Sequence, residues 1–167
     1  MGARSEALAK QFEAKAREAM ATLEQLDDSD WRKVTTAERW PVGVTAHHFA
    51  TTVQPISSMV KAVAAGESLG TLSPEMLDEM NARHAKEHAG CTRAETIALH
   101  REAAAMAAAT IRELSDAQLA RSATVLIGVP PMTAEQLIQS ALLDHIDEHF
   151  GSIRKTVGGA AHSRARS

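Results

Sequence analysis

The segment "LLDHIDEHFGSIR" (residues 142–154) places two histidines, His145 and His149, four residues apart in an otherwise apolar run. Side chains at this spacing lie on the same face of an α-helix, so both imidazoles are expected to point in one direction about one turn apart. Apolar side chains flank the pair over much of the circumference, which is typical of a helix that packs against several neighbours. The segment therefore predicts a buried helix, spanning residues 133–157, in an all-helical fold.

Four further segments with helical hydrophobic spacing precede it, and short polar breaks separate them. Pro55 lies inside the second of these segments and is expected to kink that helix. The stretch before the last helix, residues 115–132, predicts at most one helical turn and a short extended piece. The sequence thus predicts an up-and-down four-helix bundle with one shorter extra helix, as a single domain over residues 1–167, with residues 158–167 frayed. The four additional predicted helices span residues 5–26, 42–65, 74–89 and 92–114.

Composition excludes several classes of function. The formal net charge is only -3, so no electrostatic attraction to nucleic acid or an anionic membrane is expected. No apolar stretch approaches the roughly 20 residues that a membrane-spanning helix needs, and no signal peptide is recognisable at the N-terminus. A single cysteine, Cys91, is incompatible with an internal disulfide and compatible with the reducing cytoplasm. These features favour a cytoplasmic protein that acts on a small molecule.

A third histidine from another helix would turn the pair on the last helix into a metal site. His48 in "VGVTAHHFATT" follows Val44 by four residues and is expected on the inner face of its helix, whereas His47 is expected to face water or a neighbouring helix. Three nitrogen ligands from His48, His145 and His149 would leave coordination positions open for water or substrate. Two histidines at this spacing without a third ligand are more often ordinary core or surface residues.

The remaining histidines carry weaker signals. His84 and His88 form a second pair with this spacing, but charged residues surround them, so they are expected on a solvated helix face and outside the metal site. His100 and His162 belong to no recognisable constellation. Cys91 lies at a predicted helix start, where the helix dipole can lower a thiol pKa, but no base lies beside it in sequence. It is interpreted as a structural or incidental thiol.

Three stretches together resemble the DinB-like superfamily, which includes the YfiT and mycothiol-dependent maleylpyruvate isomerase branches. Residues 30–50, "DWRKVTTAERWPVGVTAHHFA", place Trp40 eight residues before His48, as in that family. Residues 80–99, "MNARHAKEHAGCTRAETIAL", resemble its Asn-Ala segment and the following helix start. Residues 132–154, "MTAEQLIQSALLDHIDEHFGSIR", resemble its last helix, which carries two ligands four residues apart. The resemblance extends from about residue 8 to residue 156.

The resemblance implies a four-helix bundle in which His48, His145 and His149 hold a divalent metal, most often zinc or nickel. Family members with assigned chemistry transfer low-molecular-weight thiols such as mycothiol or bacillithiol, or use them in isomerisation. We therefore expect a metal-dependent thiol S-transferase. The absence of tyrosine and of a second domain prevents assignment to a branch.

Two other functions stay open: a non-catalytic metal-binding or stress-associated module, acting as a homodimer, and a plain structural bundle without metal. Asp144 and Glu148 flank the predicted ligands and are candidates for orienting them through hydrogen bonds. Asn81 is a further candidate, because it lies on the extra helix and can approach the pocket.

Overall fold

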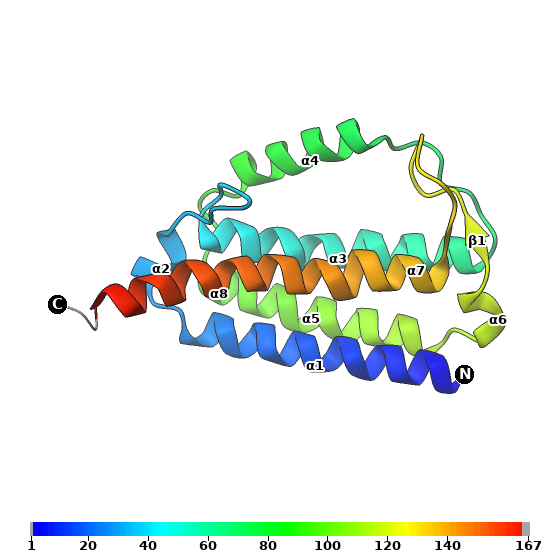
Figure 1. Cartoon of the computed structure of the whole chain (residues 1–167), viewed down its shortest axis with the longest axis horizontal. Helices are drawn as coiled ribbons and strands as arrows, with labels where there is room; N and C mark the ends of the chain where they lie inside the picture. Colours follow the sequence, from blue (N-terminus) through cyan, green and yellow to red (C-terminus); the bar gives the residue numbers. More distant parts are fainter. Residues whose placement is uncertain (1, 165–167) are drawn as a thin grey trace.

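Four long helices lie side by side and form the bundle (Figure 1). The structure is a computed structural model that describes the backbone of residues 2–164 and the side chains of residues 2–158. The helices are α1 (Ala3–Gln25), α3 (Val42–Ala64), α5 (Arg93–Arg112) and a long C-terminal helix that ends in α8 (His145–Arg164). Helix α5 packs against both α1 and α3, and α8 closes the bundle against α3 and α1. The predicted fold class is confirmed.

The shorter α4 (Pro74–Glu87) is the extra helix and carries the chain back along the outside of the bundle (Figure 1). Because α4 returns the chain to the end where α3 began, α3 and α5 run in the same direction. Ser73 caps α4, since its side chain accepts a hydrogen bond from the Met76 backbone N–H, and Pro74 occupies the first turn as predicted. None of the residues of α4 is fully buried, so this helix contacts the bundle less extensively than the others.

The core follows directly from the hydrophobic spacing. Helix α1 buries one stripe of side chains at intervals of three and four residues, and α3 is buried along its entire first two turns. Three phenylalanines fill the centre and are almost fully inaccessible to solvent: Phe12, Phe49 and Phe150. Pro55 lies inside α3 without ending it. The core extends along all four long helices, so the bundle has a continuous apolar interior.

Short elements connect the long helices. Between α1 and α3 lies a single turn, α2 (Asp28–Arg32), and α6 (Asp116–Leu119) follows α5. A two-residue strand β1 (Ser122–Ala123) pairs antiparallel with β2 (Met132–Thr133), so residues 115–132 match the predicted helical turn and extended piece. The described residues include no helix that is both long and apolar enough to cross a membrane.

The C-terminal helix is not regular along its length. It begins with α7 (Ala134–Ile138), capped by Thr133 and Gln136 as predicted, continues through a π-helical turn, η1 (Gln139–Asp144), and then becomes α8. A π-helix accommodates one extra residue in a turn and therefore changes which face the following residues occupy. The helix ends at Arg164 instead of the predicted residue 157, and residues 165–167 of the predicted frayed tail lie outside the described part of the chain.

Candidate metal centre

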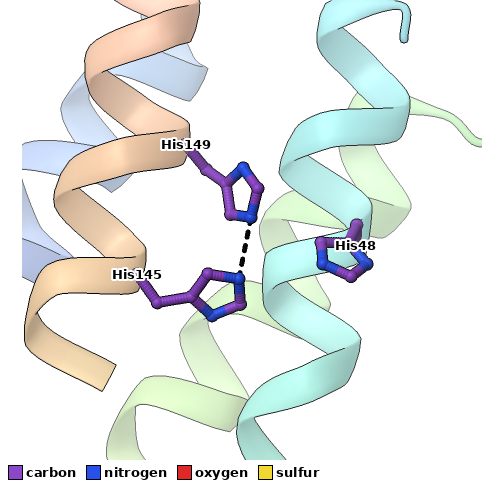
Figure 2. A group of neighbouring side chains, drawn as sticks. All are labelled: His48, His145 and His149. Atoms are coloured by element: carbon purple, nitrogen blue, oxygen red, sulfur yellow. Dashed lines mark hydrogen bonds between the residues drawn. The ribbon is translucent and has the colours of Figure 1, made fainter. Parts of the chain in front are cut away.

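Three histidines from two helices converge at one point between α3 and α8. One ring nitrogen of each histidine lies within 4.8 Å of a ring nitrogen of the other two: His48, His145 and His149. His145 Nε2 and His149 Nε2 are 2.7 Å apart. Figure 2 shows both rings projecting from α8 toward α3, which carries His48. The structure therefore brings together the three residues that the sequence predicted as ligands.

His48 lies in the buried first half of α3. Its ring contacts Trp40 edge-on, with ring centroids 5.2 Å apart, and contacts His149 at 5.2 Å and His145 at 5.7 Å in the same manner. Burial, followed by the neighbouring His149 and His145, lowers the pKa of His48 to about 3. Its Nδ1 is buried and has no hydrogen-bond partner among the described residues. Buried polar nitrogens normally have partners, so an unpaired one is consistent with a position for a ligand or ion.

His145 is the first residue of α8, directly after the π-helical turn. Burial and then the proximity of His149 lower the pKa of His145 to about 4. The ring packs edge-on against Phe49, with centroids 5.4 Å apart, so the core fixes one side of the site. A neutral imidazole is the form that binds a metal, and the apolar surroundings favour that form.

A carboxylate that the sequence interpretation did not identify supports the third histidine. Glu38 Oε1 lies 2.9 Å from His149 Nδ1, and Glu38 Oε2 accepts a hydrogen bond from the Ser152 hydroxyl at 2.7 Å. Burial raises the pKa of Glu38, but hydrogen bonds from Ser152, Thr35 and His149 outweigh this effect and hold the pKa below its ordinary value. With the Nδ1 proton donated to an ionised Glu38, Nε2 of His149 keeps its lone pair for a ligand.

The loop between α2 and α3 positions Glu38. The Thr35 backbone N–H donates to the Trp40 carbonyl at 2.9 Å, and Val34 forms an isolated bridge with Pro41, so the loop folds back on itself. Arg39, next to Glu38, adopts a left-handed backbone conformation with φ of 60°. This conformation is unusual for a residue with a side chain. The tight turn directs Glu38 inward to the histidines.

Trp31 anchors the same loop to α3. Its indole N–H donates to the Cys91 carbonyl at 3.0 Å, which ties the loop to the segment before α5. The ring covers Gly43, where a Cβ atom would lie only 2.2 Å from Trp31 Cε2. Gly43 therefore allows a close approach that no larger residue permits without a shift of the ring.

Two of the three residues that were predicted to orient the ligands lie on the outer surface of the last helix. Asp144 and Glu148 are exposed, and Asp144 accepts a hydrogen bond from the Gln139 amide at 3.0 Å. Asn81 is half-buried on α4. A role for these three residues stays a prediction, whereas Glu38 makes a direct contact with a ligand candidate. Its separation from His149 by 111 positions gave no local signal in the sequence.

The expectation that His84 and His88 occupy a solvated face is wrong. Both are half-buried and stack against His47, with centroid distances of 5.1 and 4.5 Å. His47 was predicted to face either water or a neighbouring helix. It is buried against α4, so it faces a neighbouring helix. Burial, with contributions from His88 and His47, lowers the pKa of His84 to about 4. The charged residues Lys86 and Glu87, which lie between the two histidines in sequence, are exposed, whereas the histidine rings turn toward His47.

Two other sequence features have structural explanations. His100 is buried in the core, and its Nε2 lies 3.3 Å from the Ala16 carbonyl, so it is a satisfied core histidine. Burial raises the pKa of the Cys91 thiol, and the nearby Thr96 hydroxyl only partly opposes this effect. The thiol is therefore not activated by its position near the start of α5, in agreement with an incidental role.

The donor set fits a divalent ion of the zinc and nickel class. The group of three contains only imidazole nitrogens, which such ions prefer, and three protein ligands leave at least one position open. The fold and this group define a helical bundle with a candidate three-histidine metal centre. The chain belongs to the DinB superfamily, whose family model matches residues 11–153.

Solved structures show the same fold. YfiT from Bacillus subtilis, described as "a probable metal-dependent hydrolase with an unusual four-helix bundle topology", superimposes with a TM-score of 0.74 at 18% identity, covering 95% of this chain and 90% of that one. The mycothiol-dependent maleylpyruvate isomerase superimposes with a TM-score of 0.70 at 15% identity, covering 89% of this chain and 60% of that one. No curated protein sequence matches this chain significantly.

Proposed function

We propose that this protein is a cytoplasmic, divalent-metal-dependent enzyme that activates a low-molecular-weight thiol for transfer to a small electrophile. The observation that carries the proposal is the convergence of His48, His145 and His149 on one point without a carboxylate among the ligand candidates. Such a centre has the open positions that an exchangeable ligand requires. A purely structural zinc site would have four protein ligands.

The position of Glu38 favours a thiol over water as the activated ligand. Metal-dependent hydrolases commonly use a free carboxylate beside the metal as a general base. Both oxygens of Glu38 are already engaged, one by His149 and the other by Ser152. A thiol needs no such base, because a coordinating thiol is deprotonated outright by a divalent ion.

Each residue of the site has a defined part in this proposal. His48, His145 and His149 would hold the divalent ion, which would supply the Lewis acidity needed to deprotonate a thiol. Glu38 keeps His149 oriented with its Nε2 lone pair directed inward. Trp40 and Phe49 pack against His48 and His145 and restrict their rotation. The thiol proton passes to solvent, a carbon–sulfur bond forms, and the electrophile's leaving group departs with the electron pair of the broken bond.

The relatives agree with metal-dependent chemistry in general. One similar structure is described as a metal-dependent hydrolase and another as an isomerase that depends on mycothiol. The second description supports a thiol as co-substrate for this chain.

The test combines metal content and thiol consumption. Tag-free protein, purified without a nickel column, would be loaded with zinc or nickel and supplied with mycothiol or bacillithiol and monobromobimane as electrophile. We expect a metal-dependent rate of thiol loss above the uncatalysed background. His145→Ala should abolish it, whereas Lys155→Gln, an exposed residue on the same helix, should retain it. Metal binding without thiol consumption by any of these thiols would instead support the non-catalytic metal-binding alternative.

A further inference from the structure

A second histidine cluster lies beside the candidate metal centre, on the adjacent face of α3. His47 immediately precedes His48, so its side chain is rotated by about 100° around the axis of α3. It faces α4, where it contacts His84 and His88. The ring centroids of the three histidines are 4.5 to 5.1 Å apart. His84 also contacts His48, with centroids 5.5 Å apart, so the two clusters are neighbours.

We propose that His47, His84 and His88 form a second divalent-metal site, which fastens α4 onto α3. The site would take an ion that prefers imidazole nitrogen, such as zinc, nickel, cobalt or copper. It does not depend on the chemistry proposed for the first centre, because it uses different side chains on a different face of α3.

The spacing of the donor atoms supports this assignment. His47 Nδ1 and His84 Nε2 lie 3.1 Å apart. Two nitrogens bound to one tetrahedral ion at 2.0–2.1 Å are roughly 3.3 Å apart, so the pair is already close to the required separation. His88 lies one helical turn from His84 at the C-cap of α4, and rotation of its side chain would bring a third nitrogen to the ion.

The surroundings also favour a cation. The carboxylates of Glu87 and Glu95 act electrostatically on His84 and His47, respectively, and would offset the charge of an ion. Helix α4 has no fully buried residue, so its attachment to the bundle depends on a small number of contacts. The contact between His47 and His84 is one of them, and an ion would replace a single hydrogen bond with stronger coordinate bonds.

The experiment measures how many ions bind and whether α4 becomes protected. Tag-free apoprotein would be titrated with Co²⁺, and the bound equivalents would be counted after gel filtration. Hydrogen exchange of residues 74–87 would be measured with and without the ion. The variants are His84→Gln combined with His88→Gln, His145→Ala to remove the first centre, and Lys86→Gln as an exposed control on α4.

We expect two equivalents in the natural protein and in Lys86→Gln, and one in each of the other two variants. Exchange in α4 should slow on Co²⁺ binding in the natural protein and in His145→Ala, but not in the double variant. A natural protein with one ion that His145→Ala abolishes would overturn the second site and leave the first intact. Unchanged exchange in α4 on metal binding would overturn the fastening. Two equivalents retained by His145→Ala would count against the first centre alone.

Discussion

Glu38 and His149 are joined by a hydrogen-bonding contact of 2.9 Å across 111 positions of sequence. The contact links the irregular loop before α3 to the second turn of α8, and it fixes the side-chain orientation of one of three candidate ligands. Carboxylates in this position raise the basicity of a ligating histidine and hold its tautomer. The conformation of the loop before α3 therefore affects how tightly the candidate centre can bind a metal ion.

Replacing Glu38 with alanine is expected to weaken metal binding about 10- to 100-fold, because His149 loses its orienting partner. The affinity can be measured by competition with a chromophoric chelator. Glu24→Ala, which removes an exposed carboxylate on α1, is the matched control and should bind as tightly as the natural protein. Equal affinity in both variants would show that the hydrogen bond to His149 has no part in metal binding.

His48→Ala and His145→Ala should each lose one equivalent of bound zinc or nickel, since three ligands cannot be reduced to two without a large loss of affinity. Metal analysis of protein purified without a nickel column measures this directly. His100→Gln provides a histidine control outside the cluster, although its fold must first be checked because the side chain is buried. Full metal content in both ligand variants would refute the assignment.

The apoprotein should lose stability as the pH falls below about 6.5. In the folded chain the pKa values of His48 and His145 are about 3 and about 4, whereas a histidine in the unfolded chain has the ordinary pKa of 6.5. Between these values the unfolded state binds more protons, so the free energy of unfolding falls as the pH decreases, by about 2–3 kcal/mol for each of the two histidines between about pH 6.5 and pH 4.5. Urea unfolding at pH 7 and pH 4.5 tests this, and His145→Gln should show a smaller dependence.

Metal release is expected at a lower pH than free imidazole would suggest. An ordinary histidine pKa predicts loss of the ion below about pH 6. Because burial keeps His48 and His145 neutral at lower pH, protons compete with the metal at these two ligands only under more acidic conditions. Equilibrium dialysis from pH 7 to pH 4 should show retention at pH 5.5. Release centred above pH 6 would contradict the effect of burial on the ligands.

Chelation at neutral pH should leave the helices intact. The apolar core runs through all four long helices and does not depend on the candidate centre. Circular dichroism before and after chelation should show the same helical signal. The melting temperature should fall, because an ion that binds only the folded state stabilises it. Collapse of the helical signal would mean that the metal is structural and would argue against the proposed enzyme.

Gly43→Ala should destabilise the protein by about 1–3 kcal/mol, because the added methyl group collides with the Trp31 ring. The hydrogen bond from Trp31 to the Cys91 carbonyl limits how far the ring can move. Gly151→Ala, in α8 where the added carbon would have no tertiary neighbour within 4 Å, should instead be neutral or stabilising. Thermal unfolding of the two variants gives the comparison.

The sequence predicted the parts of this protein that depend on regular helical spacing. His145 and His149 share a face because of their four-residue separation, and burial of the first half of α3 brought His48 to meet them. Glu38 could not be predicted in this way, since its position depends on a loop with an unusual backbone conformation at Arg39. The cluster around His47 was missed because the sequence does not reveal where α4 lies relative to α3.

Because of the π-helical turn η1, the spacing of inward-facing residues is not continuous between α7 and α8. Upstream, α7 directs Leu137 and Ile138 into the core, and downstream, α8 directs its histidines toward α3. If the same six residues formed a regular α-helix, the histidines would turn by about 100° relative to α7. The extra residue in η1 therefore allows α7 to keep its apolar contacts while His145 and His149 face α3. Deletion of one residue within η1 would convert it to a regular turn and leave the histidines facing α3, so the last helix can lose this residue without losing the candidate centre.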